Sequence, residues 1–117
     1  MGKRSKACEF SADVRHRIWE RDHGCIFCRI GYRPSSEAGG YPQVMHYVAR
    51  SHGGLGVEQN GALGCAYHHQ MLDNGLYHDE MQKLFREYLE EHYPVWNESE
   101  LTYDKWKIFK GGLNAAT

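Results

Sequence analysis

The sequence contains no long hydrophobic run and almost no net charge, and each absence excludes a class of protein. No apolar stretch in the 117 residues approaches the roughly 20 residues that a membrane-spanning helix requires. The basic start, "MGKRSKACEF", is not followed by the apolar region of a secretory signal, so we expect no export and a cytoplasmic location. The formal net charge is only -1, so any contact with nucleic acid must be local.

Internal repeats are also absent, and the length suits one domain. With 41% hydrophobic and 25% charged residues, the chain can enclose a single core but is short for two. We therefore expect one domain over residues 1–117, with a frayed tail at about residues 111–117. Four cysteines without an export signal indicate a reducing compartment, where close Cys and His pairs are metal ligands and not disulfides.

Hydrophobic spacing predicts two well-defined helices. Ser11 suits an N-cap, and the apolar residues after it predict a helix over about residues 12–22, which Gly24 can close. The longest helix is expected over residues 76–93, where Pro94 stops it. Its apolar residues fall on one stripe, which consists of Tyr77, Met81, Leu84, Phe85, Tyr88 and Leu89.

Between these helices the sequence predicts a surface loop, two strands and a short helix. Residues 31–43 are rich in Gly, Pro and Ser and predict the loop. The segment "VMHYVAR", residues 44–50, has β-branched and aromatic residues typical of a short strand. "GALGC", residues 61–65, can return as its partner, and a helix is expected over residues 66–73.

Two pairs of metal-ligand residues lie far apart in the sequence. Cys25 and Cys28 form a C-x-x-C pair, and Cys65 and His68 form a C-x-x-H pair. Together they offer the four ligand types that a tetrahedral structural zinc ion prefers. The alternatives for the first pair are a redox dithiol, whose usual βαβ surroundings are missing, and two ordinary core cysteines. Cys8 lies at no such spacing, so we expect a free thiol there.

The helix that carries His68 suggests a second metal site. Adjacent side chains on a helix are turned by roughly 100°, so His69 faces a different neighbour. His69 and Asp73 are four residues apart, share a helix face and could hold a catalytic divalent ion. This pair is weak by itself, because adjacent histidines also occur as surface or capping residues and aspartate is common before an "NG" turn.

The order of these features resembles the HNH nuclease family. In "MHYVARSHGGLGVEQNGALGCAYHH", His46, Asn60 and His69 stand at the three signature positions of that family. The likeness runs over roughly residues 14–92 and is closest to the small HNH proteins of tailed phages and prophages. It implies an α+β fold: a ββα-metal finger with a core at about residues 43–75 and a structural zinc site, flanked by an N-terminal helix and a longer C-terminal helix.

The resemblance also implies a reaction, the hydrolysis of DNA phosphodiester bonds with a divalent cation such as Mg²⁺, Mn²⁺, Ni²⁺ or Zn²⁺. His46 would be the general base that takes a proton from the attacking water, and Asn60 would orient it through hydrogen bonds from its amide. His69 would be a metal ligand, with Asp73 as a second one. Arg50 could contact a substrate phosphate oxygen, although an exposed structural arginine is an equal alternative.

Two positions depart from the family pattern. Met45 stands where many HNH enzymes have an Asp or His that binds the metal, and a thioether is a poor ligand for Mg²⁺ or Mn²⁺. His68 stands where the family often has a fourth zinc cysteine, an exchange that zinc sites tolerate. The alternative to an enzyme is therefore a zinc-stapled module that binds DNA or protein, with an impaired catalytic metal site.

We expect the enzyme to act on DNA as a monomer of low sequence specificity. A monomer with one site would cut one strand per encounter, which predicts nicking. Basic residues gather in "GKRSK", "RHRIWER" and "KWKIFK", which could grip the DNA backbone if the fold brings them beside the finger. The related phage proteins commonly work with the DNA-packaging terminase, so its large subunit is the partner that the resemblance implies.

Overall fold

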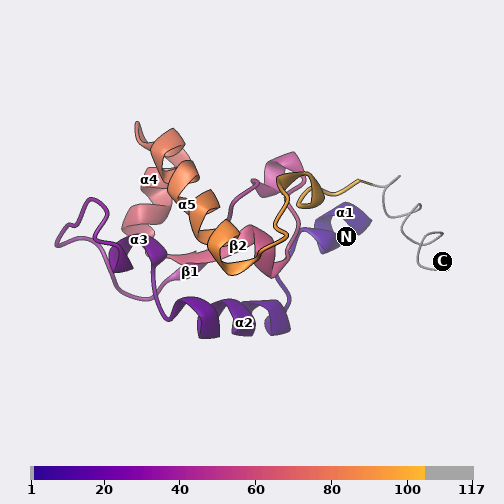
Figure 1. Cartoon of the computed structure of the whole chain (residues 1–117), viewed down its shortest axis with the longest axis horizontal. Helices are drawn as coiled ribbons and strands as arrows, with labels where there is room; N and C mark the ends of the chain where they lie inside the picture. The colour runs from indigo at the N-terminus through magenta and orange to yellow at the C-terminus, as the bar shows by residue number, and fades with distance from the viewer. Residues whose placement is uncertain (1, 105–117) are drawn as a thin grey trace.

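The computed structural model describes residues 2–104, in which a small two-stranded sheet lies between helices (Figure 1). The strands β1 (Gln43–His46) and β2 (Gly61–Gly64) are antiparallel, and His46 is opposite Gly61. The α-helices, in chain order, are α1 (Lys3–Ala7), α2 (Ala12–Asp22), α3 (Ile26–Arg29), α4 (Ala66–Asn74) and α5 (His78–His92). In Figure 1, α2 lies below the sheet and α4 and α5 lie above it, so the described chain has a mixed α and β fold.

The first predicted helix is confirmed as α2, and its start follows from its cap. The Ser11 side chain accepts a hydrogen bond from the Val14 N–H at 3.2 Å, which satisfies one of the unpaired donors at the helix start. The helix ends at Asp22, as predicted, but His23 and not Gly24 is the left-handed residue that caps it (φ 61°). Gly24 and Cys25 then turn the chain into α3.

The strand expected at residues 44–50 is shorter, because β1 ends at His46. After it the chain leaves the sheet and forms a 3₁₀ turn at Arg50–His52. Successive side chains of β1 point to opposite faces, so Met45 is 1% exposed in the core while His46 is only partly buried. Position 64 on β2 needs a glycine, because a Cβ there would lie 2.2 Å from the Sδ of the buried Met45.

The longest predicted helix is confirmed as α5, and its apolar stripe closes the core. Met81, Phe85 and Leu89 are fully buried, while the other members of the predicted stripe pack at its edges. The helix ends at His92, two residues before Pro94, as the lack of a proline N–H requires. None of the helices in residues 2–104 has both the length and the apolar character that crossing a membrane requires.

The short helix α1 was not predicted, and it covers the glycine-rich loop between the strands. The Gly56 N–H donates to the Ala7 carbonyl at 3.0 Å. A Cβ on Gly56 would lie 1.9 Å from the Glu9 carbonyl oxygen, so this close approach of two backbones needs glycine. The tail predicted at residues 111–117 and the basic segment at residues 105–110 lie outside the described residues.

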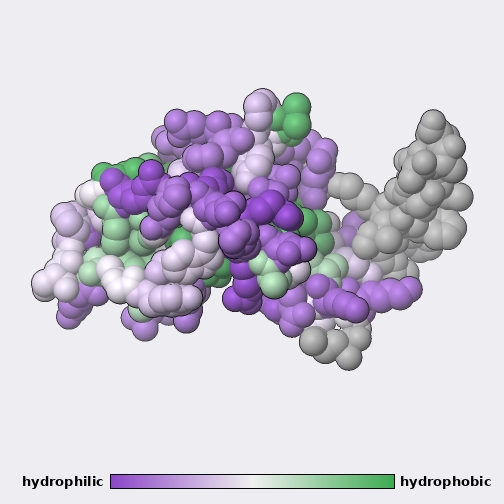
Figure 2. All heavy atoms as spheres, turned by 90° about the horizontal axis from the view of Figure 1, so that it is seen from below, coloured by the Kyte–Doolittle hydropathy of each residue, from purple (hydrophilic) through white to green (hydrophobic). Residues whose placement is uncertain are grey.

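The face that carries α2 is largely hydrophilic, with hydrophobic atoms visible in separate patches (Figure 2). Large apolar side chains exposed elsewhere stand singly, as Leu76 and Val95 do at 96% and 90% exposure. Isolated apolar side chains of this kind are normal on a protein surface and need no special role.

Candidate functional site

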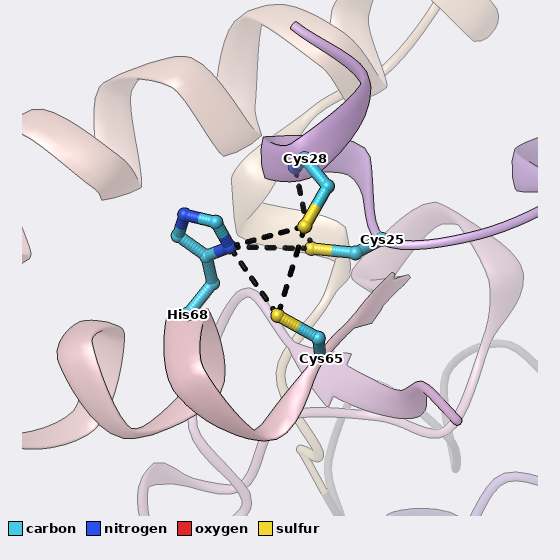
Figure 3. Close-up of side chains that lie close together, drawn as sticks. All are labelled: Cys25, Cys28, Cys65 and His68. Atoms are coloured by element: carbon cyan, nitrogen blue, oxygen red, sulfur yellow. Dashed lines mark hydrogen bonds between the residues drawn. The ribbon is translucent and has the colours of Figure 1, made fainter. Parts of the chain in front are cut away.

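Four metal-ligand side chains converge where α3, β2 and α4 meet (Figure 3). Cys25 precedes α3 and Cys28 lies within it, whereas Cys65 precedes α4 and His68 lies in its first turn. Their ligand atoms all lie within 4.8 Å of one another. The fold thus joins two pairs that are about forty residues apart in the sequence, as the spacing of the ligands predicted.

The separations within this Cys₃His cluster suit a tetrahedral metal ion. The Nδ1 atom of the histidine lies 3.6, 3.5 and 3.3 Å from the Sγ atoms of Cys25, Cys28 and Cys65. The Sγ atoms of Cys28 and Cys65 are 3.8 Å apart. Zinc bonds of about 2.3 Å to sulfur and about 2.0 Å to nitrogen place tetrahedral ligands about 3.5–3.8 Å apart. The cluster could therefore bind a metal ion such as zinc.

The orientation of the His68 ring also suits a metal ligand. Its Nε2 lies 2.8 Å from the carbonyl oxygen of Tyr32, and a carbonyl can only accept a hydrogen bond. The proton therefore belongs on Nε2, which leaves the Nδ1 lone pair directed at the three sulfurs. Sequence reasoning missed this contact, because Tyr32 lies in a loop and acts through its backbone.

The thiols of the cluster differ in acidity. Burial alone would raise the pKa of Cys65, but hydrogen bonds from the Gly39 and His68 backbones and contact with the His68 side chain lower it to about 6. Burial, followed by the neighbouring Cys25 and Cys65, raises the pKa of Cys28 to about 12. Cys65 therefore loses its proton more readily than Cys28, and a metal that binds the cluster must displace the Cys28 proton.

His46, the predicted general base, is held by the N-terminal segment. Its Nε2 lies 2.9 Å from the Cys8 carbonyl oxygen, so by the same reasoning Nε2 carries the proton and Nδ1 keeps its lone pair. The Phe10 ring packs on the imidazole with centroids 4.3 Å apart. Neither contact was predictable, since residues 8–10 carry no motif.

The surroundings of His46 favour its neutral form. Burial lowers the pKa of the imidazole below its ordinary value of 6.5, and the hydrogen bond to Cys8 partly opposes this effect. The positive charges of Arg50 and His69 lower the pKa further. Since this pKa lies below 6.5, His46 is mainly unprotonated at pH 7.

Asn60 is fully buried and ties the loop between the strands. Its Oδ1 accepts from the Val48 N–H at 2.7 Å, and its Nδ2 donates to the carbonyls of Val48 and Leu55 at 3.2 and 2.8 Å. The expected hydrogen bond from this amide to His46 is not among these contacts. The backbone carbonyl of Asn60 instead accepts from the N–H of Tyr47, the residue after His46, at 2.8 Å.

His69 and Asp73 share one face of α4, as their spacing predicted. The His69 Nε2 lies 3.4 Å from Asp73 Oδ2, and the side chains are 29% and 60% exposed. Ligands about 2.0–2.2 Å from one ion can be this far apart, so the pair fits a divalent cation. Within residues 2–104, no third His, Cys, Asp or Glu joins them in a metal-ligand cluster, and Met45 is buried in the core.

Arg50 is compatible with both expected roles, which are a phosphate contact and a structural contact. Its side chain is 46% exposed and also contacts the segment that contains α1. Its Nη2 donates to the carbonyl and the hydroxyl of Ser5 at 3.1 and 3.2 Å and lies 3.9 Å from Glu9. These contacts place "GKRSK" beside the loop that follows His46. In "RHRIWER", by contrast, Arg17 pairs with Glu58 and Arg21 pairs with Asp22.

Comparisons with known proteins identify no relative of this chain. No family model matches it, and neither a curated protein nor a solved structure matches it. The chemical interpretation of these residues therefore depends on their geometry and on the sequence motifs that they form.

Proposed function

We propose that this protein is a metal-dependent endonuclease of the HNH type, whose ββα-metal finger consists of β1, β2 and α4. The observation that carries the proposal is the imidazole of His46 at the end of β1, which the Cys8 carbonyl orients and whose pKa burial lowers toward the neutral form. Asn60, the third signature residue, supports the proposal by tying the intervening loop to the end of β1.

Hydrolysis of a phosphodiester needs an activated water molecule and positive groups that stabilise the developing charge. In the proposed reaction, the Nδ1 of His46 takes the proton of the attacking water. The Cys8 carbonyl accepts from Nε2 before and after this transfer, so it keeps the ring oriented and stabilises the imidazolium. Arg50, outside this proton transfer, contributes a guanidinium that can contact a phosphate oxygen of the bound strand.

His69 and Asp73 are the residues that would hold the catalytic cation, Mg²⁺, Mn²⁺, Ni²⁺ or Zn²⁺. Such an ion, when bound, neutralises charge on the phosphate and on the leaving oxygen. The Cys₃His cluster would hold a separate structural zinc ion, which links α3 to the start of α4 and so fixes the helix that carries His69.

The substrate that we propose is duplex DNA, cut with low sequence specificity. A monomer with one such site would nick one strand in each encounter. A further proposal, from the resemblance to phage HNH proteins alone, is that the protein works in the cytoplasm of a bacterial or phage-infected cell with the terminase large subunit.

A second candidate function is a zinc-stapled module that binds DNA or protein without cutting it. The observation that favours it is the buried Met45, which leaves His69 and Asp73 as the only proposed protein ligands of the catalytic ion. Two ligands bind a divalent ion weakly unless the substrate phosphate supplies more.

The decisive experiment measures conversion of supercoiled plasmid to the open circle at low salt. Wild-type protein and His46→Ala are compared with each of the four cations and without added metal. Metal-dependent nicking that His46→Ala abolishes supports the nuclease and identifies the base.

The matched control is His16→Ala, which removes an exposed histidine that pairs with Glu20 on α2. This variant should nick like the wild type. If folded, zinc-loaded wild type nicks with none of the cations, the nuclease proposal fails and the binding module becomes the better explanation.

A further inference from the structure

A basic recess lies between α1 and the 3₁₀ turn at Arg50–His52. Its volume is about 600 Å³, and its lining consists of Gly2, Arg4, Ser5, Cys8, Arg50 and Ser51. The two walls are tied reciprocally, because the Arg4 Nη2 donates to the Ser51 carbonyl at 3.1 Å while the Arg50 Nη2 donates to Ser5. These contacts hold both guanidinium groups at one opening.

The charge around the recess is opposite to that of the longest helix. Residues 2–10 and Arg50–His52 contain four Lys or Arg residues and one carboxylate, Glu9. Helix α5 instead contains five Asp or Glu residues and two basic ones. The net charge of the whole chain is only -1, but its charges are unevenly distributed. Of the elements compared, the positively charged ones border the recess.

Both arginines retain hydrogen-bond donors for a ligand. A guanidinium has five N–H groups, and within residues 2–104 the contacts of Arg4 and Arg50 use only Nη2. Their Nε and Nη1 groups can donate to a phosphate, which the planar fork of arginine matches in geometry. Arg4 also has no ion pair within the described residues, so binding a phosphate would not require it to leave a carboxylate.

One residue, Cys8, connects the recess to His46, the proposed general base. Cys8 lines the recess, and its carbonyl holds the Nε2 of His46 at 2.9 Å. A DNA strand whose scissile phosphate lies at His46 could therefore place another of its phosphates at this opening.

We infer that Arg4 and Arg50 form a subsite for a non-scissile phosphate of the DNA backbone, built by α1 against the loop after β1. This inference rests on the proposed function for the identity of its ligand. The subsite positions the strand by charge and does not read bases, because phosphate contacts carry no sequence information.

The test measures binding of a fluorescent 20-base-pair duplex to the full chain without added divalent cation, over a range of salt concentrations. Each phosphate contact contributes about 1 to the slope of log K against log salt. Arg4→Ala should weaken binding and reduce the slope by about 1, and Arg4→Ala with Arg50→Ala should reduce it by about 2. Arg4→Lys should keep the slope, since it keeps the charge.

The matched control is Lys83→Ala, which removes an exposed positive charge from α5, away from α1 in Figure 1. Its slope should equal that of the wild type. Circular dichroism and zinc content verify that each variant is folded. If Arg4→Ala keeps the wild-type slope, or if Lys83→Ala lowers the slope equally, the subsite is wrong.

Plasmid nicking by the same variants separates this inference from the proposed function. Nicking by the wild type together with an unchanged slope in Arg4→Ala overturns the subsite and leaves the nuclease standing. A reduced slope in Arg4→Ala, in a protein that nicks with no cation, supports the subsite and overturns the nuclease.

Discussion

The protonation state of His46 depends on residues that lie outside its own strand, β1. Burial is the main cause of its lowered pKa, and the charges of Arg50 and His69 act in the same direction. The unfolded chain therefore takes up a proton at a higher pH than the folded protein does. The favourable contribution of neutral His46 to stability is complete above pH 6.5 and is lost as the pH falls through the lowered pKa.

An NMR titration of the His46 imidazole in the zinc-loaded protein tests this direction. The midpoint should lie below 6.5 in the folded protein and return to about 6.5 in urea. Arg50→Ala should raise the folded midpoint, since it removes a positive charge. A midpoint at or above 6.5, or a fall in Arg50→Ala, would contradict the assigned environment.

Met45 and Gly64 are far apart in the sequence, and their steric contact is seen only in the folded structure. A Cβ on Gly64 would lie 2.2 Å from the Met45 Sδ, so Gly64→Ala should destabilise the protein by about 1–3 kcal/mol in urea unfolding. Met45→Ala leaves a cavity and should cost about 2–5 kcal/mol. The double variant should cost less than the sum, because each change relieves the other.

Gly2→Ala is the control for this pair, since a Cβ there meets nothing within 4 Å. Its stability should equal that of the wild type. Strict additivity of Gly64→Ala and Met45→Ala would show that the two residues do not compete for the same space.

At the scale of elements, the loop between β1 and β2 depends on Asn60 for its shape. Asn60→Ala would leave the partly buried N–H of Val48 and two carbonyls without their partner, and an unsatisfied buried group costs about 1–3 kcal/mol. We expect a loss of at least about 2 kcal/mol in the free energy of unfolding and faster amide exchange in residues 47–56.

Asn97→Ala is the matched change at an exposed position. Asn97 caps a three-residue 3₁₀ turn by accepting from the Ser99 N–H at 3.0 Å. Its loss should cost less than about 1 kcal/mol. If the two variants are equally stable, Asn60 does not organise the loop.

Helix α1 shows why some elements escape prediction. It has five residues and no buried side chain, so its sequence has no apolar stripe to indicate it. Its position depends on contacts with the distant loop, such as the Gly56 N–H to the Ala7 carbonyl at 3.0 Å. Helices α2 and α5, in contrast, have a cap or an apolar stripe in their own sequence and were predicted closely.

At the scale of the whole molecule, the Cys₃His cluster joins segments that the small sheet alone would hold weakly. Two four-residue strands cannot stabilise a domain by themselves. Metal analysis of protein purified without added metal should find about one tightly held zinc ion. Its removal by a chelator should unfold the chain, as circular dichroism would detect.

Cys25→Ser should lose the zinc ion and the fold, whereas Cys8→Ala should keep both. Cys8 is a matched control because it is also buried but lies outside the cluster. Retention of zinc and of stability by Cys25→Ser would contradict the assignment of the ligands.

The sequence by itself determined which residues could serve as metal ligands and where the strongest helices lie. Ligand types at short spacings and apolar residues at helical spacing are local properties, so the Cys25 and Cys65 pairs and the helix α5 could be predicted from them. The face shared by His69 and Asp73 follows from the same local periodicity.

Only the tertiary structure decided how these parts act together. The carbonyls that orient His46 and His68 belong to Cys8 and Tyr32, and a backbone oxygen leaves no sign in the sequence of the residue that it contacts. The recess at Arg4 likewise exists because α1 packs against a loop that lies 47 residues later at the Arg4–Ser51 contact. Backbone contacts between distant segments depend on the folded path of the chain, which no local pattern records.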